Sequence, residues 1–580
     1  MRGENLRFWL PVCLLATFSV YAAQKLVCSH VNPEVAAPDY YFNRKINGRR
    51  GAVYSSCGKN YPFVKSVPFW EYHLDPVALT NSVVRRRGEP PRPKAAIVKT
   101  IADALGLDFR RLMAMSENSK RRYQFLALSS NPEAHRILAD SRLVAGVSIE
   151  EKQVRQYLHG RRLAHVLGSV NAEHVGSAGI EQRYNNVLTG TPGTVRGMKD
   201  ARGRELYDKR IVSIDPIPGA DIYLTVDHNI QYEAETALKW GVEEYGAAEG
   251  WCIVMDARSA AVLAMASLPD FEPLSFGRIS DDVKINRAIA FNYEPGSVMK
   301  VITAAAAIDA GVVRPTTLYR TNRDDPKYYR LPNDAGHVWD PLMSVRDGIV
   351  KSSNIVIGKL SWDLGPKRLW SYMKSFGFGE KTGIELPGEQ YGILWNWKKW
   401  DKATWSRAGI GQGVSVTAIQ LAGAYQAIAN DGVRMSPYIV DKIVNHDGSL
   451  MYSHSPKTAG RVISAVTART MREMMLGVAA PGGTARRAAI KGFSIAGKTG
   501  TAQKSVGRTY APGLFRASFC GIVPATDPRL VVLVTLDFDE RALYHQGGNS
   551  AGPVFKRITE AALRYLMVTP DRPDELEDEE

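Results

Sequence analysis

Cysteine is scarce in this chain of 580 residues, which contains only five. Cys13 lies in an apolar segment, and the other four show none of the spacings that zinc sites use. Disulfides therefore do not hold the chain together, and apolar cores must supply its stability. A chain of this length exceeds what one core can serve, so we expect two or more domains. The sequence also lacks any internal repeat of the solenoid type.

Net negative charge is lacking too, because 74 Lys and Arg residues outnumber 59 Asp and Glu residues. The densest basic run, RRRGEPPRPK at 85–94, has the Pro and Gly content of an exposed loop. No aromatic or helical recognition pattern accompanies it, so we expect no nucleic-acid partner. A basic surface suits an anionic membrane or a pyrophosphate-bearing substrate. The acidic end, DRPDELEDEE, predicts a disordered tail, placed at 568–580.

An apolar run near the N-terminus begins FWLPVCLLATFSVYAA and extends over 8–27. Its length is close to the lower limit for a membrane span. Arg2 and Arg7 precede it and one lysine follows, which favours a cytoplasmic N-terminus over 1–7. We therefore expect a single-pass anchor in the bacterial cytoplasmic membrane, with the rest of the chain outside the cytoplasm. The alternative is a cleaved signal peptide, for which SVYAA offers small residues.

Residues 45–215 have a mixed, charged pattern that indicates an α+β domain. Strand-like pieces are RGAVYS and the region of GSAGIEQRYNNVLTG. Periodicity near 3.6 predicts helices at 97–115 and near 150–166.

From 216 to 567 the order of elements indicates a second domain. A strand, Asp227 and an amphipathic helix come first, followed by the hairpin GWCIVMD and AAVLAMASLP. A helical region covers about 285–430, and three strand-like runs with a closing helix end the domain. This order predicts a mixed α/β fold with an antiparallel sheet flanked by helices.

The stretch EPGSVMKVIT at 294–303 carries the first candidate chemistry. Ser297 and Lys300 lie on one face of a predicted helix over 297–308, because residues three apart share a face. The other faces are apolar, so the helix should be buried almost all round. A desolvated lysine has a lowered pKa and can act as a base for a neighbouring serine nucleophile. The alternative is a serine N-cap beside a lysine that reaches the surface.

Serine–lysine acyl enzymes need two further motifs, S-x-N and K-T-G. Downstream, KSSNIVIGKL supplies Ser352 and Asn354, and IAGKTGTAQ supplies Lys498, Thr499, Gly500 and Thr501. Each motif also occurs elsewhere, as at Ser56–Lys59, Ser371–Lys374, Ser129–Asn131 and Lys381–Gly383. None of those repeats the required order, spacing and setting, since the last lies in a Gly- and Pro-rich loop. The triplet therefore predicts an acyl-transfer site.

With these motifs in place, residues 45–567 resemble a class B penicillin-binding protein, a membrane-anchored peptidoglycan D,D-transpeptidase. Further similar stretches include RQYLHGRRLAHVLG, GSAGIEQRYNNVLTGTPG, LTVDHNIQ, GIELPGE and GGTARRAAIKGFSIAGKTGTAQ. SVPFWEYHLDP and the approach to K-T-G are closer to the cell-division (septal) type than to the elongation type. One departure follows Arg50–Gly51, where SSCG stands in place of an Asp-Arg-Asn-Gly-like turn.

The resemblance implies a penicillin-binding/β-lactamase-like transpeptidase domain over 216–567 with a five-stranded antiparallel sheet. An elongated α+β pedestal of the dimerisation type would precede it over 45–215, after the transmembrane helix. The family's strand order would put the last strand between Cys252 and Cys520. Two strand spacings, about 9–10 Å, exceed the reach of a disulfide, so we expect two packed thiols.

The resemblance also implies roles. Ser297 would attack the penultimate D-Ala carbonyl of a stem peptide ending in D-Ala-D-Ala, with Lys300 as general base. Ser352 and Lys498 would relay a proton to the leaving amine, while Asn354 orients Lys300 and the substrate amide. β-Lactams would acylate the same serine. No cofactor or metal is needed.

Substrate binding is implied for the residues around the K-T-G motif. The backbone N–H groups of Ser297 and Thr501 would form the oxyanion hole. The hydroxyls of Thr499 and Thr501 suit the terminal carboxylate, and Gly500 lets the peptide lie close to the strand. Outside the triplet, Gly411–Gly413 predicts a tight turn at the rim. The aromatic stretch WNWKKW at 395–400 suits a carbohydrate platform, although we expect packing instead.

Several rival functions share these motifs. A D,D-carboxypeptidase uses the same acyl-enzyme with water as acceptor, whereas a β-lactamase needs no 170-residue preceding domain and a sensor needs several membrane spans. A scaffold for wall-synthesis proteins is the rival from another class. By resemblance, the anchor and the 45–215 domain would contact a membrane glycosyltransferase of the SEDS (FtsW-like) type and other division proteins.

Overall fold

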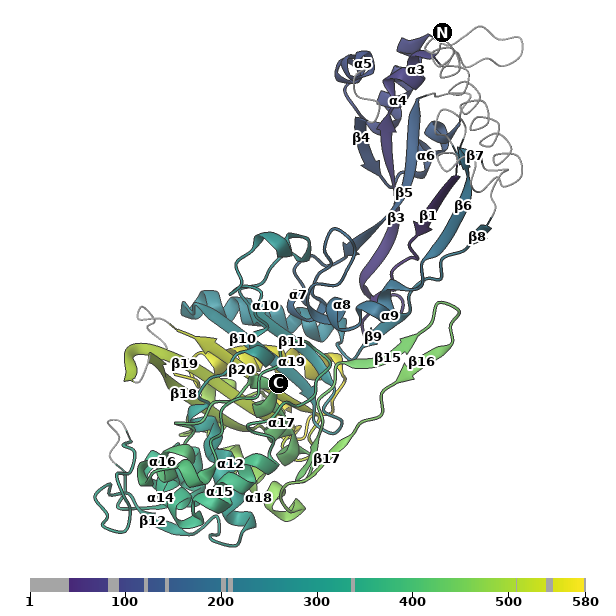
Figure 1. The fold of residues 1–580 in the computed structure, drawn as a ribbon. Coiled ribbons are helices and arrows are strands. Elements are labelled where there is room, and N and C mark those ends of the chain that lie inside the picture. Colours follow the sequence, from purple (N-terminus) through teal and green to yellow (C-terminus); the bar gives the residue numbers. More distant parts are fainter. Residues whose placement is uncertain are drawn as a thin grey trace, which may run out of the picture. The chain divides into compact units, whose positions relative to one another are not determined.

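The computed structural model describes residues 41–81, 93–118, 124–140, 146–199, 205–206, 212–334, 339–506, 509–538 and 546–577. The chain forms two compact units (Figure 1): residues up to Gly51 with Asn186–Ala220, and Ala52–Asn185 with Asp221–Glu580. The predicted anchor at 8–27 and most of the basic run at 85–94 lie outside the described residues. Within the described ranges, every helix is too short or too polar to span a bilayer.

The smaller unit contains a four-stranded antiparallel sheet around one central strand. β6 (Gly193–Lys199) pairs on one side with β1 (Tyr41–Ile46) in full register from Tyr41–Met198 to Ile46–Gly193. β7 (Glu205–Leu206) and β8 (Val212–Ile214) pair with β6 as well. The predicted 45–215 domain thus contributes to both units, because its residues 52–185 pack with the following chain.

The first part of the larger unit is built on a seven-stranded sheet in the order β16-β15-β9-β2-β3-β4, with β5 also on β3. Its strands are Val53–Tyr54 (β2), Pro62–Leu74 (β3), Gln124–Ser129 (β4), Val147–Tyr157 (β5), Asp221–Leu224 (β9), Val440–Val444 (β15) and Leu450–Ser453 (β16). β2 lies in the predicted strand piece RGAVYS, which confirms that prediction.

A small helical subdomain packs on the end of β3 and β4. Its helices are Pro76–Asn81 (α3), Lys94–Leu105 (α4), Phe109–Glu117 (α5) and Pro132–Ala139 (α6). They share a core that includes Ile97, Ile101 and Leu112. The single helix predicted at 97–115 is wrong, because Gly106 ends α4 in the left-handed conformation and Asp108 caps α5.

Two further local predictions in this region are wrong. Residues 150–166 were expected to be helical, but β5 pairs with β3 residue by residue from Val147–Leu74 to Tyr157–Val64. The strand-like stretch around 176–190 instead forms the short helices α8 (Gly179–Arg183) and α9 (Asn185–Thr189). In the first case an eleven-residue ladder decided the conformation over local periodicity.

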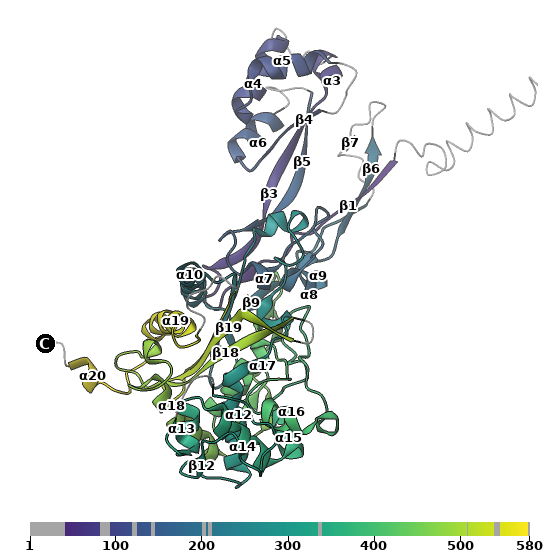
Figure 2. The ribbon, with the colours of Figure 1, turned by 90° about the vertical axis from the view of Figure 1, so that its left-hand side faces the viewer.

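The second part of the larger unit contains the predicted five-stranded antiparallel sheet, in the order β11-β10-β20-β19-β18. The strands are Glu249–Asp256 (β10), Val262–Leu268 (β11), Ala496–Val506 (β18), Thr509–Val523 (β19) and Leu530–Asp537 (β20). Figures 1 and 2 show α10 (His228–Tyr245) and α19 (Ala551–Tyr565) together beside this sheet. α17 (Ala418–Ala429) packs on the strands from the other face, so every residue of β20 is buried.

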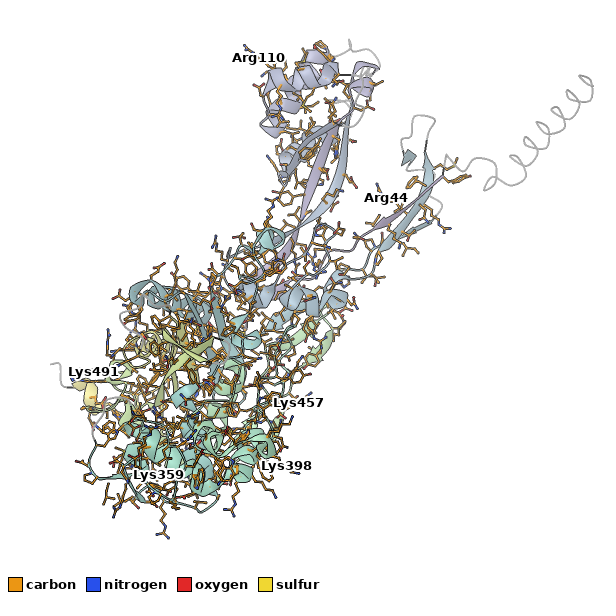
Figure 3. The ribbon with its side chains drawn as sticks, turned by 60° about the vertical axis from the view of Figure 1, so that its left-hand side comes forward. Arg44, Arg110, Lys359, Lys398, Lys457 and Lys491 are labelled. Carbon is orange, nitrogen blue, oxygen red and sulfur yellow. The ribbon has the colours of Figure 1, made fainter. Side chains whose placement is uncertain are left out.

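A group of helices lies below the sheet in Figure 1 and positions the candidate motifs. It comprises α12 (Lys300–Asp309), α14 (Asn354–Leu364), α15 (Pro366–Ser375), α16 (Lys402–Ala408) and α18 (Ala465–Ala479), with α13 (Val345–Val350) labelled among them in Figure 2. All eight residues Lys300–Ala307 are buried, as the apolar pattern predicts. Figure 3 shows the side chains of this region, with Lys359 and Lys398 labelled.

The cysteine prediction is confirmed. Cys252 on β10 pairs with Val534, and Cys520 on β19 pairs with Leu533, so β20 lies between the two thiols. Both are free and buried, and burial raises the pKa of Cys252 to about 12.

The acidic end was predicted to be disordered, and this prediction is wrong for the residues up to 577 that the structure describes. The carboxylate of Asp571 accepts hydrogen bonds from the backbone N of Ser494 at 2.7 Å and from Thr526 Oγ1 at 2.7 Å. Arg572 Nη1 lies 3.2 Å from Glu575 Oε1, and Asp574–Glu577 forms the short helix α20. Acidic side chains that find donors on the domain surface hold this segment in place.

Candidate active site

Ser297 lies in a turn of 3₁₀ helix, Gly296–Met299, that runs directly into α12. Gly296 has a φ of 58°, and its N–H donates to Gly411 O at 3.2 Å. Tyr425 Oη donates to Val298 O at 2.9 Å from the buried helix α17. These contacts fix the turn on both sides, and they confirm the predicted position of Gly411 at the rim. The Oγ of Ser297 itself has no hydrogen-bond partner among the described residues.

Lys300, one turn further along, is completely buried. Its Nζ donates to Ser352 O at 2.5 Å and to Ser352 Oγ at 3.2 Å. Burial lowers the pKa of Lys300 to about 7, with the charge of Asp334 acting in the opposite direction. A substantial fraction of this amine is therefore neutral near pH 7 and can accept a proton.

Ser352 occupies the turn between α13 and α14 with a φ of 60°. A residue other than glycine rarely adopts this conformation, at a cost on the order of 1–3 kcal/mol. Its Oγ accepts from Lys498 Nζ at 2.9 Å as well as from Lys300 Nζ. The hydroxyl therefore lies between two lysine amines that come from α12 and β18.

Lys498 is also completely buried on β18. Its Nζ donates to Thr499 O at 3.0 Å and contacts Thr499 Oγ1 at 3.3 Å. Burial first, and the charge of Lys300 second, hold the pKa of Lys498 well below its usual range. Two ammonium ions on one buried hydroxyl would repel each other, so the pair favours neutral amines.

Gly500 and its neighbours form the edge of the sheet that faces Ser297. A Cβ at Gly500 would lie 3.2 Å from Pro295 O and 3.2 Å from Val298 Cγ1. Its missing side chain therefore allows β18 to approach the serine turn. Thr499 Oγ1 donates to Thr484 Oγ1 at 3.0 Å, and Thr501 Oγ1 accepts from Gly547 N at 3.2 Å. The predicted substrate-binding residues thus line the edge strand beside Ser297.

The side chain of Asn354 makes its hydrogen bond to a residue other than the two lysines. Its Nδ2 donates to Asn333 O at 2.7 Å, and its side chain has no hydrogen bond to Lys300 among the described residues. In this structure Ser352, rather than Asn354, holds the Lys300 amine. The backbone N of Asn354 donates to the carboxylate of Asp334.

Asp334 is the residue that sequence reasoning missed. It is buried, and it accepts from Ser353 Oγ at 2.6 Å, from Ile355 N at 3.3 Å and from Trp339 Nε1 at 3.0 Å. It thereby fixes the N-terminus of α14, directly after Ser352. An aspartate in the irregular stretch LPNDAG carries no local signal for this contact.

The alternative motif copies have structural roles elsewhere. Thr382 N and Oγ1 donate to Glu389 at 2.6 Å within a loop, and Ser371 Oγ donates to Lys367 O inside α15. Asn131 caps α6. Among the described residues no cluster of three or more His, Cys, Asp or Glu side chains can hold a metal.

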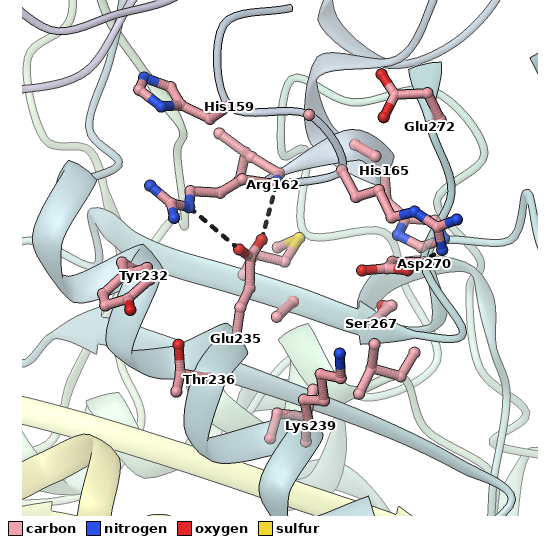
Figure 4. A pocket seen from close by; sticks show the side chains of 18 residues that line it. His159, Arg162, His165, Tyr232, Glu235, Thr236, Lys239, Ser267, Asp270 and Glu272 are labelled. Carbon is pink, nitrogen blue, oxygen red and sulfur yellow. Dashed lines mark hydrogen bonds and ion pairs between the residues drawn. The ribbon is translucent and has the colours of Figure 1, made fainter. Parts of the chain in front are cut away.

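A cavity of about 420 Å³ lies away from the motifs, between residues 159–165 and the helix α10 (Figure 4). Glu235 projects toward it and accepts from Leu163 N at 2.7 Å and Gln231 Nε2 at 2.7 Å. Burial raises the pKa of Glu235 to about 7. None of the predicted catalytic residues lines this cavity.

Two family profiles match the chain: residues 250–560 match the penicillin binding protein transpeptidase domain, and residues 45–224 match the penicillin-binding protein dimerisation domain. Together they cover most of the sequence, on the two parts that the sequence pattern distinguishes.

Individual relatives agree with these family profiles. The penicillin-binding protein PbpB of Mycolicibacterium smegmatis is 33% identical over 475 residues, which cover 79% of this chain and 71% of the relative. The peptidoglycan D,D-transpeptidase FtsI of Escherichia coli is 29% identical over 529 residues, which cover 91% and 85%.

Among solved structures, penicillin binding protein 3 of Mycobacterium tuberculosis in complex with aztreonam aligns with a TM-score of 0.67 and 27% identity. The alignment covers 91% of this chain and 99% of that one. Profile, relatives and fold thus agree with the serine–lysine geometry, and the chain belongs to the class B penicillin-binding proteins, the peptidoglycan D,D-transpeptidases.

Proposed function

We propose that the protein cross-links peptidoglycan stem peptides through an acyl-enzyme on Ser297, and that β-lactams acylate the same residue. The observation that carries this proposal is the pair of buried lysine amines on Ser352 Oγ, of which Lys300 lies one helical turn after Ser297. A surface lysine would stay protonated at neutral pH and could not act as a base.

In the proposed acylation, Ser297 Oγ bonds to the penultimate D-Ala carbonyl carbon and its proton passes to the neutral amine of Lys300. The peptide bond to the terminal D-Ala then breaks. The leaving amine takes a proton from Ser352 Oγ, which regains one from the protonated amine of Lys300, while the neutral Lys498 donates a hydrogen bond to the same oxygen. An acceptor amine then attacks the ester carbonyl carbon and gives up a proton to the neutral amine of Lys300. The bond from that carbon to Ser297 Oγ breaks, and Ser297 Oγ takes the proton back from Lys300.

The backbone N–H groups of Ser297 and Thr501 are the proposed oxyanion donors, each typically worth about 3–4 kcal/mol. Thr499, Thr501 and Lys498 would bind the terminal carboxylate. Gly500 keeps the edge strand close to the serine turn, which supports an extended substrate on that strand. Asn354, two residues after Ser352, is the proposed ligand of the substrate amide.

We further propose a septal setting. The relatives named FtsI and stage V sporulation protein D support a role in division over one in elongation. The apolar segment 8–27 is the proposed single-pass anchor, with the catalytic domain outside the cytoplasm. A membrane glycosyltransferase is the proposed partner of the anchor and the 45–215 region. D,D-carboxypeptidase activity differs only in the acceptor, water in place of an amine.

The test is labelling of the full chain with a fluorescent penicillin, beside a Ser297→Ala variant. We expect the parent to be labelled, the variant to remain unlabelled, and peptide mapping to locate the adduct on Ser297. An adduct on any other residue, or none on the folded parent, would contradict the proposal. Incubation with a D-Ala-D-Ala donor, with and without an added amine, then separates transpeptidation from hydrolysis.

A further inference from the structure

An exposed aromatic stripe flanks the candidate active site. Tyr391 is 58% exposed, Ile393 43% and Trp395 58%, whereas Trp400 is buried. The side chain of Leu394 turns inward against Gly379. The packing expected for the stretch 395–400 therefore holds for Trp400 and fails for Trp395. Exposed apolar side chains gathered in one place mark binding surfaces.

Backbone hydrogen bonds hold the stripe beside the rim of the site. Ile393 N donates to Ser415 O at 2.7 Å, and Ser415 N donates back to Ile393 O at 2.9 Å. On the other side of the same loop, Tyr293 N donates to Val416 O at 3.0 Å. Two strand spacings, about 10 Å, thus separate the stripe from the segment that leads into Ser297.

A hydrogen bond from the start of α17 also fixes the position of the stripe. Gln420 Nε2 donates to Tyr391 O at 2.8 Å and to Glu380 O at 2.7 Å. Gln420 is buried and belongs to the capping box at the start of α17. The stripe therefore does not need to be ordered by a ligand, which lowers the entropic cost of binding.

Lysines accompany both rings. Lys381 Nζ lies 4.9 Å from the ring centroid of Tyr391, and Lys399 Nζ lies 5.0 Å from that of Trp395. Lys398 is exposed beside them and labelled in Figure 3. The surface thus combines two aromatic side chains that are 58% exposed with ammonium donors that lie over their rings.

We propose that Tyr391, Ile393 and Trp395 bind the glycan strand that carries the stem peptides, an inference that rests on the proposed function. A pyranose ring presents C–H groups on its faces and hydroxyls on its edges. The C–H groups suit the negative face of an aromatic ring, and the hydroxyls accept hydrogen bonds from lysine. A stem peptide bound along β18 beside Ser297 brings its own sugar chain toward the rim of the site, near this stripe.

The test measures binding of glycan strands from which an amidase has removed the stem peptides, by calorimetry on the full chain. One variant carries Tyr391→Leu and Trp395→Leu, which keep apolar area without rings. A second carries Tyr391→Phe and Trp395→Phe, which keep the rings. The matched control is Tyr452→Leu, an exposed aromatic on β16 (38% exposed). Penicillin acylation of Ser297 is measured on every protein.

We expect the leucine variant to bind the strands at least about tenfold more weakly and the phenylalanine variant to bind within about threefold of the parent. The Tyr452 control should bind as the parent does, with acylation unchanged throughout. Equal binding by parent and leucine variant, or no binding by the parent, would overturn the inference while normal acylation leaves the proposed function standing. Binding of the same proteins to anionic lipid vesicles is measured as well. If the leucine variant loses binding to the vesicles but not to the glycan strands, the stripe is a membrane contact and the inference is overturned. Absence of acylation in the parent would instead count against the proposed function.

Discussion

At the residue scale, Lys300 and Lys498 interact with the same serine hydroxyl and are both withdrawn from water. Burial disfavours the charged form of each amine, and each charge would disfavour the other. The positive charge with which Lys498 would bind the terminal carboxylate is therefore suppressed in the free site. An incoming carboxylate raises the pKa of Lys498 again, so we expect substrate binding to be coupled to proton uptake.

The lowered pKa of Lys300 predicts the pH dependence of acylation. A protonated Lys300 cannot accept the proton of Ser297, so the acylation rate should fall about tenfold per pH unit below the pKa. With the pKa of Lys300 lowered to about 7, the rate should be near its plateau only above that pH. The measurement is the second-order rate constant for a fluorescent penicillin across that range.

Thermal unfolding at each pH is the control, because it separates titration from loss of structure. A rate that stays constant through pH 7 in folded protein would show that Lys300 is not the base whose titration limits acylation.

At the scale of elements, the N-terminus of α14 positions the hydroxyl between the lysines. Ser353 caps the helix through Val356 N at 3.1 Å, and the Asp334 carboxylate accepts from Ser353 Oγ and from the backbone of the first turn. A carboxylate at a helix N-terminus is favoured by the helix dipole. The strained turn at Ser352 is therefore held by Asp334, a loop residue that precedes Ser353 by 19 positions in the sequence.

Replacement of this carboxylate should affect both stability and chemistry. Asp334→Asn removes the charge from hydrogen bonds that each contribute about 1.5–3 kcal/mol, so we expect lower thermal stability and slower acylation together. Asp401→Asn is the matched control, because Asp401 caps α16 through Thr404 N at 2.7 Å from an exposed position. The control should lose about 1 kcal/mol or less and acylate at the parent rate.

Thermal unfolding and penicillin acylation of both variants check this prediction. Equal acylation rates for Asp334→Asn and Asp401→Asn would show that the cap on α14 does not position Ser352.

At the scale of the whole molecule, the larger unit joins residues 159–165 to the transpeptidase part through Glu235. This side chain is 28% exposed, and it lies between Leu163 N and Gln231 on α10. Arg162 Nε is 3.6 Å from its other oxygen, too long for a strong ion pair. Desolvation is therefore the largest influence on this carboxyl.

The raised pKa of Glu235 predicts a stability that depends on pH. Its pKa rises from 4.5 to about 7 in the folded protein, so between these values the folded state holds a proton that the unfolded state has released. The free energy of unfolding should therefore fall as the pH rises through this window, by about 3 kcal/mol in total. In Glu235→Gln this part of the fall should be absent.

Denaturant unfolding at several pH values between these limits measures the slope. Glu272→Gln is the control, because Glu272 lines the same cavity (Figure 4) and should leave the slope of the parent unchanged. The same slope in parent and Glu235→Gln would contradict the prediction.

The sequence by itself determined the chemistry and the catalytic sheet. Ser297 and Lys300 lie within one helical turn, so their shared face follows from local geometry, and the apolar neighbours predict their burial. Strands and helices of the transpeptidase part have strong periodicity and clear ends, such as Asp227 before α10. The order, spacing and setting of the motifs together separated them from their copies.

Only the tertiary structure decided which distant groups meet. Nothing local links Asp334 to Ser353, brings Lys498 to Ser352, or turns Asn354 toward Asn333, because these contacts depend on how separate elements pack. Pairing with β3 made β5 a strand although its sequence has a helical period, and Gly106 divided the helix predicted at 97–115 into α4 and α5. Whether Trp395 faces solvent also depended on the loop that holds it, since an aromatic run has no period to show which side is covered.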